Sequence, residues 1–293
     1  MGERGKNMSA QLQLFLNDIE VKVITGQFPD GAVYARFAKP ETTGASQMRI
    51  RASAMCSMDD FMLLAQLTQA VRHQFLIKES LLELPYLPYA RQDRHMTSGD
   101  SFALKVFGQL LNTLAFDRVT VLDPHSEVAA AVIDNMHIIT QQQCMQHSSR
   151  LANLLTQQQL FLMAPDAGAL KKIHAVAAHF GIAQYGILTK HRDVFSGELT
   201  GFELLAGDVQ GKDVLIVDDL CDGGGTFIGS AQVLRQAGAR TVSLYVTHGV
   251  FSKGTAALLD QGIDNIYTTT SYAAAELAEQ RVELIDIESI YTL

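Results

Sequence analysis

The sequence predicts an α/β protein built from two tandem Rossmann-like domains with mostly parallel sheets. Strand-like and helix-like segments alternate along the whole chain, which is the element order of parallel α/β folds. The apolar run VLIV at residues 214–217 is typical of a strand buried on both faces of such a sheet. The chain has 293 residues, which is long enough for two domains of ordinary size.

The two halves of the chain show the same layout without an exact sequence repeat. In the first half, strand patterns cover residues 20–25, 33–38, 48–54, 80–90 and 118–127, and helical spacing covers residues 58–74 and 100–115. In the second half, strand patterns that run into polar loops cover residues 159–170, 185–193, 213–226 and 241–249, and helical spacing covers residues 171–181 and 226–239. We place the domain boundary in the Gln-rich polar segment between them, which predicts domains at 1–140 and 141–293.

Composition and charge exclude several classes of protein. The chain carries 23 Lys and Arg against 31 Asp and Glu, a net charge of −8, which argues against a general nucleic-acid binder. No stretch is apolar enough to span a bilayer, and the N-terminal segment lacks the apolar core of a signal peptide, so we expect no membrane partner and a cytoplasmic location. The three cysteines, Cys56, Cys144 and Cys221, form no CxxC pair, so neither a disulfide framework nor a zinc site is indicated.

The segment DVLIVDDLCDGGGTF at residues 213–227 combines acids with a glycine loop. Its chemistry-bearing residues are Asp218, Asp219, Asp222, Gly223, Gly224, Gly225 and Thr226. The glycines lie between a strand end and a helix start, where outward-pointing amides and the helix dipole favour a phosphate. The acids would repel a phosphate, but they can bind sugar hydroxyls or a magnesium ion. The pattern predicts a site for a phosphorylated sugar, and the alternative is a glycine turn with solvated acids.

Polar sets also follow the other strands. They are YARQDRH at 89–95, LDPHSE at 122–127, APDAG at 164–168, TKHRD at 189–193 and VTHGVFSKG at 246–254. In open α/β sheets, ligands bind outside the carboxyl ends of the strands. Each set alone is compatible with an ordinary polar loop, but together they predict a ligand-binding edge.

The motifs YARQDR and DPHSE, together with the acid–glycine segment, resemble the ribose-phosphate pyrophosphokinase family, also called phosphoribosyl pyrophosphate synthetases. The resemblance runs from about residue 21 to the end of the chain. The acid–glycine segment is shared with type I phosphoribosyltransferases, whereas the other two motifs are more specific. The resemblance implies two phosphoribosyltransferase-like domains, the first on the ATP side and the second on the ribose-phosphate side. It also implies transfer of the β,γ-diphosphate of ATP to the C1 hydroxyl of ribose 5-phosphate, with release of AMP.

The resemblance assigns roles to individual residues and implies Mg²⁺ as the cofactor. The implied ATP-binding residues are Phe28, Asp30, Arg91, Gln92, Asp93 and His125. The implied ribose-phosphate residues are Asp166 and the seven residues of the acid–glycine segment named above. Lys190, Arg192 and Asp222 are the implied catalytic residues. The transferred diphosphate needs the two cations over its developing charge, and the resemblance places Asp222 close to the reacting sugar. His125 and Asp166 are the implied metal contacts.

The resemblance also implies a homo-oligomer, a dimer or a hexamer, in which the hairpin FPDGA at 28–32 reaches the ATP of a neighbouring subunit. Departures from the family pattern keep alternatives open: Ala32 replaces a glutamate, Gly223 replaces a threonine, and residues 97–105 lack the basic residue and the proline that are common in forms regulated by inorganic phosphate and ADP. The first alternative is the same chemistry on ADP-ribose, as in phage NAD-rebuilding enzymes, in which case the location would be the host cytoplasm. The second is a catalytically silent regulatory subunit, which the retained Lys190, Arg192 and acids disfavour.

Overall fold

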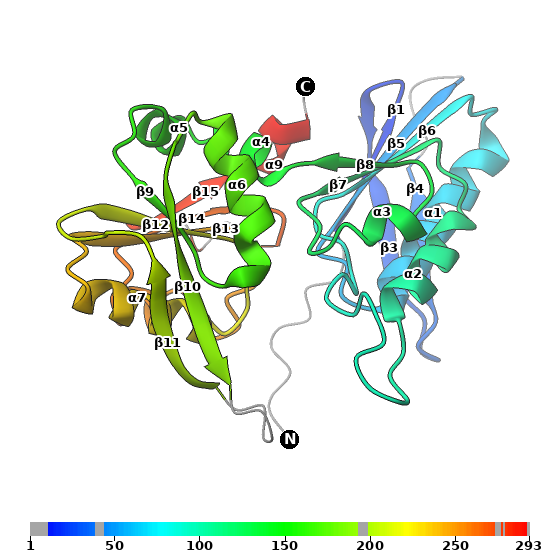
Figure 1. Cartoon of the computed structure of the whole chain (residues 1–293). Coiled ribbons are helices and arrows are strands. Elements are labelled where there is room, and N and C mark those ends of the chain that lie inside the picture. The colour runs from blue at the N-terminus through cyan, green and yellow to red at the C-terminus, as the bar shows by residue number, and fades with distance from the viewer. Residues whose placement is uncertain (1–10, 39–43, 193–198, 273–276, 278, 292–293) are drawn as a thin grey trace. The chain divides into compact units, whose positions relative to one another are not determined.

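The computed structural model describes residues 11–38, 44–192, 199–272, 277 and 279–291 (Figure 1). The side chains of residues 191–192 and 199–200 lie outside the described part. The chain divides into two compact units, residues 1–139 and 140–293.

The first unit contains a six-stranded sheet in the order β2-β1-β5-β6-β7-β8 and a separate two-stranded hairpin, β3-β4. The strands are β1 (Gln11–Leu16), β2 (Ile19–Val21), β3 (Val23–Gln27), β4 (Val33–Phe37), β5 (Gln47–Ser53), β6 (Glu79–Leu84), β7 (Arg118–Leu122) and β8 (Met136–Ile139). Strands β5 to β8 are parallel, whereas β1 is antiparallel to both of its neighbours. The carboxyl ends of β6 and β7 therefore lie side by side.

The helices of the first unit are α1 (Met58–Gln74), α2 (Ala103–Asn112) and α3 (Ala129–Val132). Helix α1 begins with a capping box, in which Ser57 and Asp60 satisfy each other's backbone amides. Its buried face carries Leu64, Leu67 and Val71, which are fully buried in one core with residues of α2 and of the sheet. This core covers one face of the sheet, and the loops that follow β6 and β7 lie beyond the carboxyl ends of these strands.

The second unit contains a seven-stranded sheet in the order β11-β10-β9-β12-β13-β14-β15. The strands are β9 (Phe161–Ala164), β10 (Tyr185–Arg192), β11 (Leu199–Ala206), β12 (Asp213–Cys221), β13 (Thr241–Gly249), β14 (Asn265–Thr269) and β15 (Val282–Ile285). All neighbours are parallel except β11, which is antiparallel to β10. Strand β12 lies between β9 and β13, and the predicted run at 214–217 is at most 1% exposed. The expected buried central strand is confirmed.

The helical elements of the second unit are α4 (Gln141–Gln146), α5 (Ser149–Thr156), the 3₁₀ turn η1 (Ala167–Ala169), α6 (Leu170–His179), α7 (Gly225–Gln236), α8 (Ala256–Leu259) and α9 (Ile287–Tyr291). Helix α4 forms within the Gln-rich segment, where Thr140 and Gln143 make a capping box. Composition had indicated only a polar stretch there. None of the helices among the described residues has the length and apolarity needed to cross a membrane.

Candidate functional site

Four neighbouring parallel strands of the second unit end at one edge of the sheet. The residues at this edge are Asp166 after β9, Lys190 near the end of β10, Asp218 and Asp219 near the end of β12, and Ser252 and Lys253 after β13. Parallel strands bring their carboxyl ends to the same side, so loops that are far apart in sequence become neighbours. This edge is the candidate ribose-phosphate site.

Asp166 is held from two directions. Its Oδ1 accepts hydrogen bonds from the amides of Gly168 and Ala169 at 2.9 and 3.2 Å, because Asp166 caps η1. Its Oδ2 accepts from Nζ of Lys190 at 2.7 Å. The structure thus brings together two residues that the sequence placed in separate motifs. Arg192 is the last residue of β10, but its side chain lies outside the described residues.

Asp218 and Asp219 are adjacent acids in different electrostatic environments. Burial raises the pKa of Asp218 well above its usual range, and the negative charge of Asp219 raises it further. Oδ1 of Asp218 accepts the amide hydrogen of Asp219 at 2.9 Å. Asp219 lies 3.8 Å from Nζ of Lys172 on α6, a residue that sequence reasoning did not select. The pair can therefore accept hydrogen bonds from sugar hydroxyls and would be stabilised by an added cation.

The glycine loop joins β12 to α7 as expected. Gly224 is the N-cap of α7 and has φ of +78°, and a Cβ atom there would lie 2.9 Å from Cδ2 of Leu258. Glycine is needed at this position for both reasons. At Gly225 a Cβ atom would meet no atom within 4 Å, so the first turn of the helix is open on that side. The first amides of a helix have no intrahelical acceptor and suit an anion.

Asp222 is anchored by a residue that sequence reasoning missed. The hydroxyl of Ser252 donates to Oδ1 of Asp222 at 2.7 Å, and the amide of Ser252 donates to the carbonyl of Asp222 at 3.2 Å. Ser252 lies in the polar set after β13, which the sequence marked as a ligand-prone loop without singling out a residue. Only the parallel pairing of β12 with β13 brings it next to Asp222.

Cys221 is fully buried, and burial raises the pKa of its thiol to about 12. A thiol with such a pKa carries almost no thiolate at neutral pH, and the thiolate is the nucleophilic form. Cys221 therefore fills space in the core and is not placed to act as a nucleophile.

The candidate ATP-binding residues of the first unit begin with the β3-β4 hairpin. Phe28 and Asp30 lie in its tight turn, which is closed by a bond from the amide of Phe28 to the carbonyl of Ala32 at 2.8 Å. Phe28 is 55% exposed, and its ring lies 5.0 Å from that of Tyr34. An exposed aromatic ring on a hairpin tip can stack against a planar base.

The loops after β6 and β7 carry the remaining candidate ATP residues, Arg91, Gln92, Asp93 and His125. The pKa of Asp93 is lowered to about 2, chiefly by its hydrogen bonds with Arg94, with further contributions from Ser126 and the positive charges of Arg94 and His125. Asp93 thus ties the two loops together. Arg91, Gln92 and His125 are exposed.

Two residues in these loops have left-handed backbones without being glycine. Tyr89 has φ of 60° and Asp123 has φ of 33°. Such conformations cost about 1–3 kcal/mol each and cluster at functional sites.

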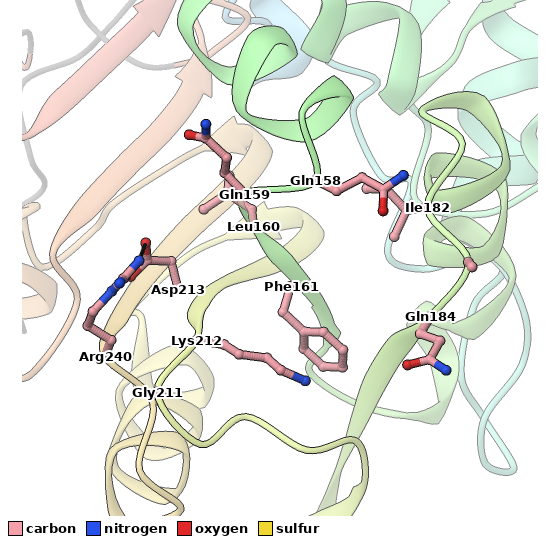
Figure 2. Close-up of a pocket in the computed structure, with 11 residues that line it drawn as sticks. Gln158, Gln159, Leu160, Phe161, Ile182, Gln184, Gly211, Lys212, Asp213 and Arg240 are labelled. Atoms are coloured by element: carbon pink, nitrogen blue, oxygen red, sulfur yellow. Dashed lines mark hydrogen bonds and ion pairs between the residues drawn. The ribbon is translucent and has the colours of Figure 1, made fainter.

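A hollow of about 500 Å³ lies at the opposite edge of the second sheet, where β9, β10 and β12 begin (Figure 2). Figure 2 shows Lys212 reaching towards the ring of Phe161, and its Nζ lies 4.7 Å from the ring centre. None of the candidate site residues lines this hollow. It therefore lies apart from the ligand-binding edge.

The acids at the carboxyl edge fit a magnesium ion that binds together with a substrate. Within the described ranges, no group of three or more His, Cys, Asp or Glu side chains gathers to hold a metal. Magnesium in phosphate sites is commonly held by one or two carboxylates, while phosphate oxygens and water complete its shell. Asp218 and Asp219 provide two adjacent carboxylates whose repulsion a cation would relieve.

Comparisons with known proteins agree with the motifs. Residues 202–292 match the family model described as "Phosphoribosyl synthetase-associated domain". A ribose-phosphate pyrophosphokinase of Corynebacterium efficiens is 29% identical over 86% of this chain and 77% of its own length, and one of Pyrococcus furiosus is 27% identical over 87% and 86%. The crystal structure of a phosphoribosylpyrophosphate synthetase from Mycobacterium smegmatis superposes with a TM-score of 0.79 at 21% identity, covering 94% of this chain and 89% of that one.

The fold and the strand-end loops thus define a tandem phosphoribosyltransferase-like protein with mostly parallel sheets, which confirms the predicted fold class. The predicted resemblance to the ribose-phosphate pyrophosphokinase family is also confirmed over most of the chain. The relatives carry the name of one transferase, ribose-phosphate pyrophosphokinase. The predicted enzyme class, an ATP-dependent diphosphokinase, is therefore also confirmed.

Proposed function

We propose that this protein is a diphosphokinase that transfers the β,γ-diphosphate of ATP to the C1 hydroxyl of ribose 5-phosphate. One observation carries the proposal: acids, a lysine and a glycine loop meet at the carboxyl edge of four parallel strands in a chain that resembles ribose-phosphate pyrophosphokinases. Residues of the first unit bind ATP in this account, and residues of the second unit bind the ribose phosphate.

The acids and the glycine loop share the binding of one sugar. Asp218 and Asp219 accept hydrogen bonds from the ribose hydroxyls, and the loop at 223–226 binds the 5-phosphate through helix-start amides. Asp222, oriented by Ser252 at 2.7 Å, faces the reacting end of the sugar. This division separates the carboxylates from the phosphate, which they would repel.

The reaction forms one bond and breaks one. The C1 oxygen of the ribose attacks the β-phosphorus of ATP, and the bond between that phosphorus and the oxygen bridging to the α-phosphorus breaks. AMP leaves with this oxygen and the electron pair, and the hydroxyl proton is released to solvent. Most of the catalysis is positioning and charge stabilisation, so no strong base is required.

Lys190 and Arg192 stabilise the transferred diphosphate in this account. Nζ of Lys190 lies 2.7 Å from Oδ2 of Asp166, so its ammonium group is held at the carboxyl edge. A cation that is positioned before the reaction stabilises developing charge without reorganising. His125 and Asp166 are the proposed magnesium contacts, and a bound magnesium ion neutralises phosphate charge.

ADP-ribose is the second candidate acceptor, and the glycine at position 223 is the observation that favours it. A Cβ atom at Gly223 would lie at an ordinary 3.5 Å from its nearest neighbour, and its backbone is not left-handed. Glycine is therefore not required there by conformation, and the missing side chain reduces the bulk of the phosphate loop. A loop without a threonine hydroxyl at this position also has one donor fewer for the outer oxygens of a terminal phosphate, which is compatible with an acceptor whose 5-phosphate carries a further group.

Product analysis tests this proposal. The enzyme is incubated with ATP, Mg²⁺ and either ribose 5-phosphate or ADP-ribose, and products are identified by mass spectrometry. We expect AMP and a ribose 5-phosphate derivative heavier by a diphosphate. ADP-ribose should at least compete with ribose 5-phosphate if the acceptor site is enlarged. Formation of ADP, or ATP consumption that does not depend on either acceptor, would contradict the proposal.

A further inference from the structure

The turn after β13 is fixed to the end of β12 by four hydrogen bonds. The amides of Val250 and Phe251 donate to the carbonyl of Cys221 at 2.9 and 3.1 Å. The amide and the hydroxyl of Ser252 donate to Asp222, at 3.2 Å to its carbonyl and at 2.7 Å to its Oδ1. These bonds fix the backbone of the turn beside the glycine loop, and therefore also the position from which the side chain of the next residue extends.

That residue is Lys253, and its side chain runs along the open side of Gly223. The Cε and Cδ atoms of Lys253 lie 3.5 and 3.7 Å from the position that a Cβ atom of Gly223 would occupy. Gly254, with φ of +77°, closes the turn through a bond from its amide to the carbonyl of Phe251 at 2.7 Å. The lysine arm thus occupies the space next to residue 223 that a larger side chain would enter.

Lys253 differs from the two other lysines of this edge. Lys190 and Lys172 are bound to Asp166 and Asp219 respectively. Within the described part of the chain, Lys253 makes no ion pair with a carboxylate. Its ammonium group is therefore available for an anionic ligand, and it is exposed to solvent.

We infer that Lys253 is a further acceptor-binding residue that binds the phosphate attached to C5 of the acceptor, in the place left by the missing side chain at Gly223. The inference rests on the proposed function, and it adds a phosphate-binding residue that the proposed function does not include. A flexible ammonium group acts as a point charge and needs little precise geometry. The same contact serves ribose 5-phosphate and ADP-ribose, because both carry a phosphate on C5.

Binding measurements on four variants test the inference. The dissociation constant of ribose 5-phosphate is measured by calorimetry for Lys253→Met, Lys253→Arg, Gly223→Thr and the double variant Gly223→Thr/Lys253→Met, beside the wild type. Lys212→Met is the matched control, since Lys212 lies at the opposite edge of the same sheet (Figure 2). ADP-ribose is titrated in parallel.

We expect Lys253→Met to weaken both acceptors by a similar factor of about 3 to 10, as for an exposed charge-assisted contact. Lys253→Arg should restore most of the affinity, and added salt should reduce the difference between Lys253→Met and wild type. In the Gly223→Thr background, Lys253→Met should have little further effect, because the threonine displaces the lysine arm. Lys212→Met should bind as the wild type does.

Unchanged binding by Lys253→Met, an effect confined to ADP-ribose, or additive effects of the two substitutions would each overturn the inference while leaving the proposed function intact. A wild-type protein that binds neither acceptor would overturn both. The two failures are therefore distinguishable in one set of titrations.

Discussion

Replacing Asp218 with asparagine should raise the melting temperature of this protein at neutral pH. The pKa of Asp218 is raised in the folded chain, first by burial and second by the charge of Asp219. Ionisation of Asp218 therefore costs folding free energy once the pH exceeds the unfolded value of about 3.9. Asparagine keeps an acceptor for the amide of Asp219, which Oδ1 of Asp218 accepts at 2.9 Å, and it cannot ionise.

The size of the effect follows from linkage. Each pKa unit corresponds to about 1.4 kcal/mol, and 1 kcal/mol changes the Tm of a unit of this size by about 2–4 °C. We therefore expect Asp218→Asn to raise Tm by at least ~3 °C at pH 7.5, and to have no effect below about pH 4, where the carboxyl is neutral in both states.

Asp213→Asn is the control, for which we expect the opposite change, a lower melting temperature at neutral pH. The pKa of Asp213 is lowered, chiefly by hydrogen bonding to Arg240, so its stabilisation is present above the unfolded pKa and is lost as the pH falls through the folded value. Because Arg240 is largely exposed, we expect a fall of only about 1–4 °C at pH 7.5. Thermal melts by circular dichroism from pH 3 to 8, without metal or substrate, compare the three proteins. A lower Tm for Asp218→Asn at neutral pH would refute the electrostatic account of this acid pair.

Three further predictions concern catalysis, regulation and thiol chemistry. Lys190→Ala should lower kcat by about 10²–10³-fold with little change in ATP binding, measured by steady-state kinetics and calorimetry; near-normal kcat with weak ATP binding would make Lys190 a ground-state ligand. Because residues 97–105 depart from the family pattern, ADP should inhibit only by competing with ATP, and a non-competitive component relieved by inorganic phosphate would show that an allosteric site survives. A thiol reagent should label Cys56 and spare the buried Cys144 and Cys221 in the native protein, and rapid labelling of Cys221 would contradict its raised pKa.

The parts of the fold with strong local patterns could be predicted from sequence. The run at 214–217 is β-prone throughout and is followed by glycines and a helical pattern, so β12, the loop and α7 were expected where they occur. Strand β1 was missed, although the alternation of polar and apolar residues in QLQLFL is typical of a strand with one buried face. Helix α4 was missed because its Gln-rich composition resembles a polar loop, although Thr140 and Gln143 form a capping box.

The candidate site could be predicted only where its residues share a motif. The acids and glycines at 218–226 lie in one short segment between a strand pattern and a helical pattern, so their grouping in one site could be predicted. Lys172, Ser252 and Lys253 join them through the pairing of β12 with β13 and the packing of α6, which no local pattern encodes. The bond between Lys190 and Asp166 likewise depends on β9 and β10 being neighbours in the sheet.

The central claim, transfer of an intact diphosphate, is tested most directly by following the reaction of ATP, Mg²⁺ and ribose 5-phosphate by phosphorus NMR. The account predicts that the ATP signals are replaced by equal amounts of AMP and of a product with one monophosphate signal and two mutually coupled diphosphate signals. Lys190→Ala should give the same products at a much lower rate. Appearance of ADP with a ribose bisphosphate that gives two monophosphate signals, or no change in the ATP signals that depends on ribose 5-phosphate, would contradict the account.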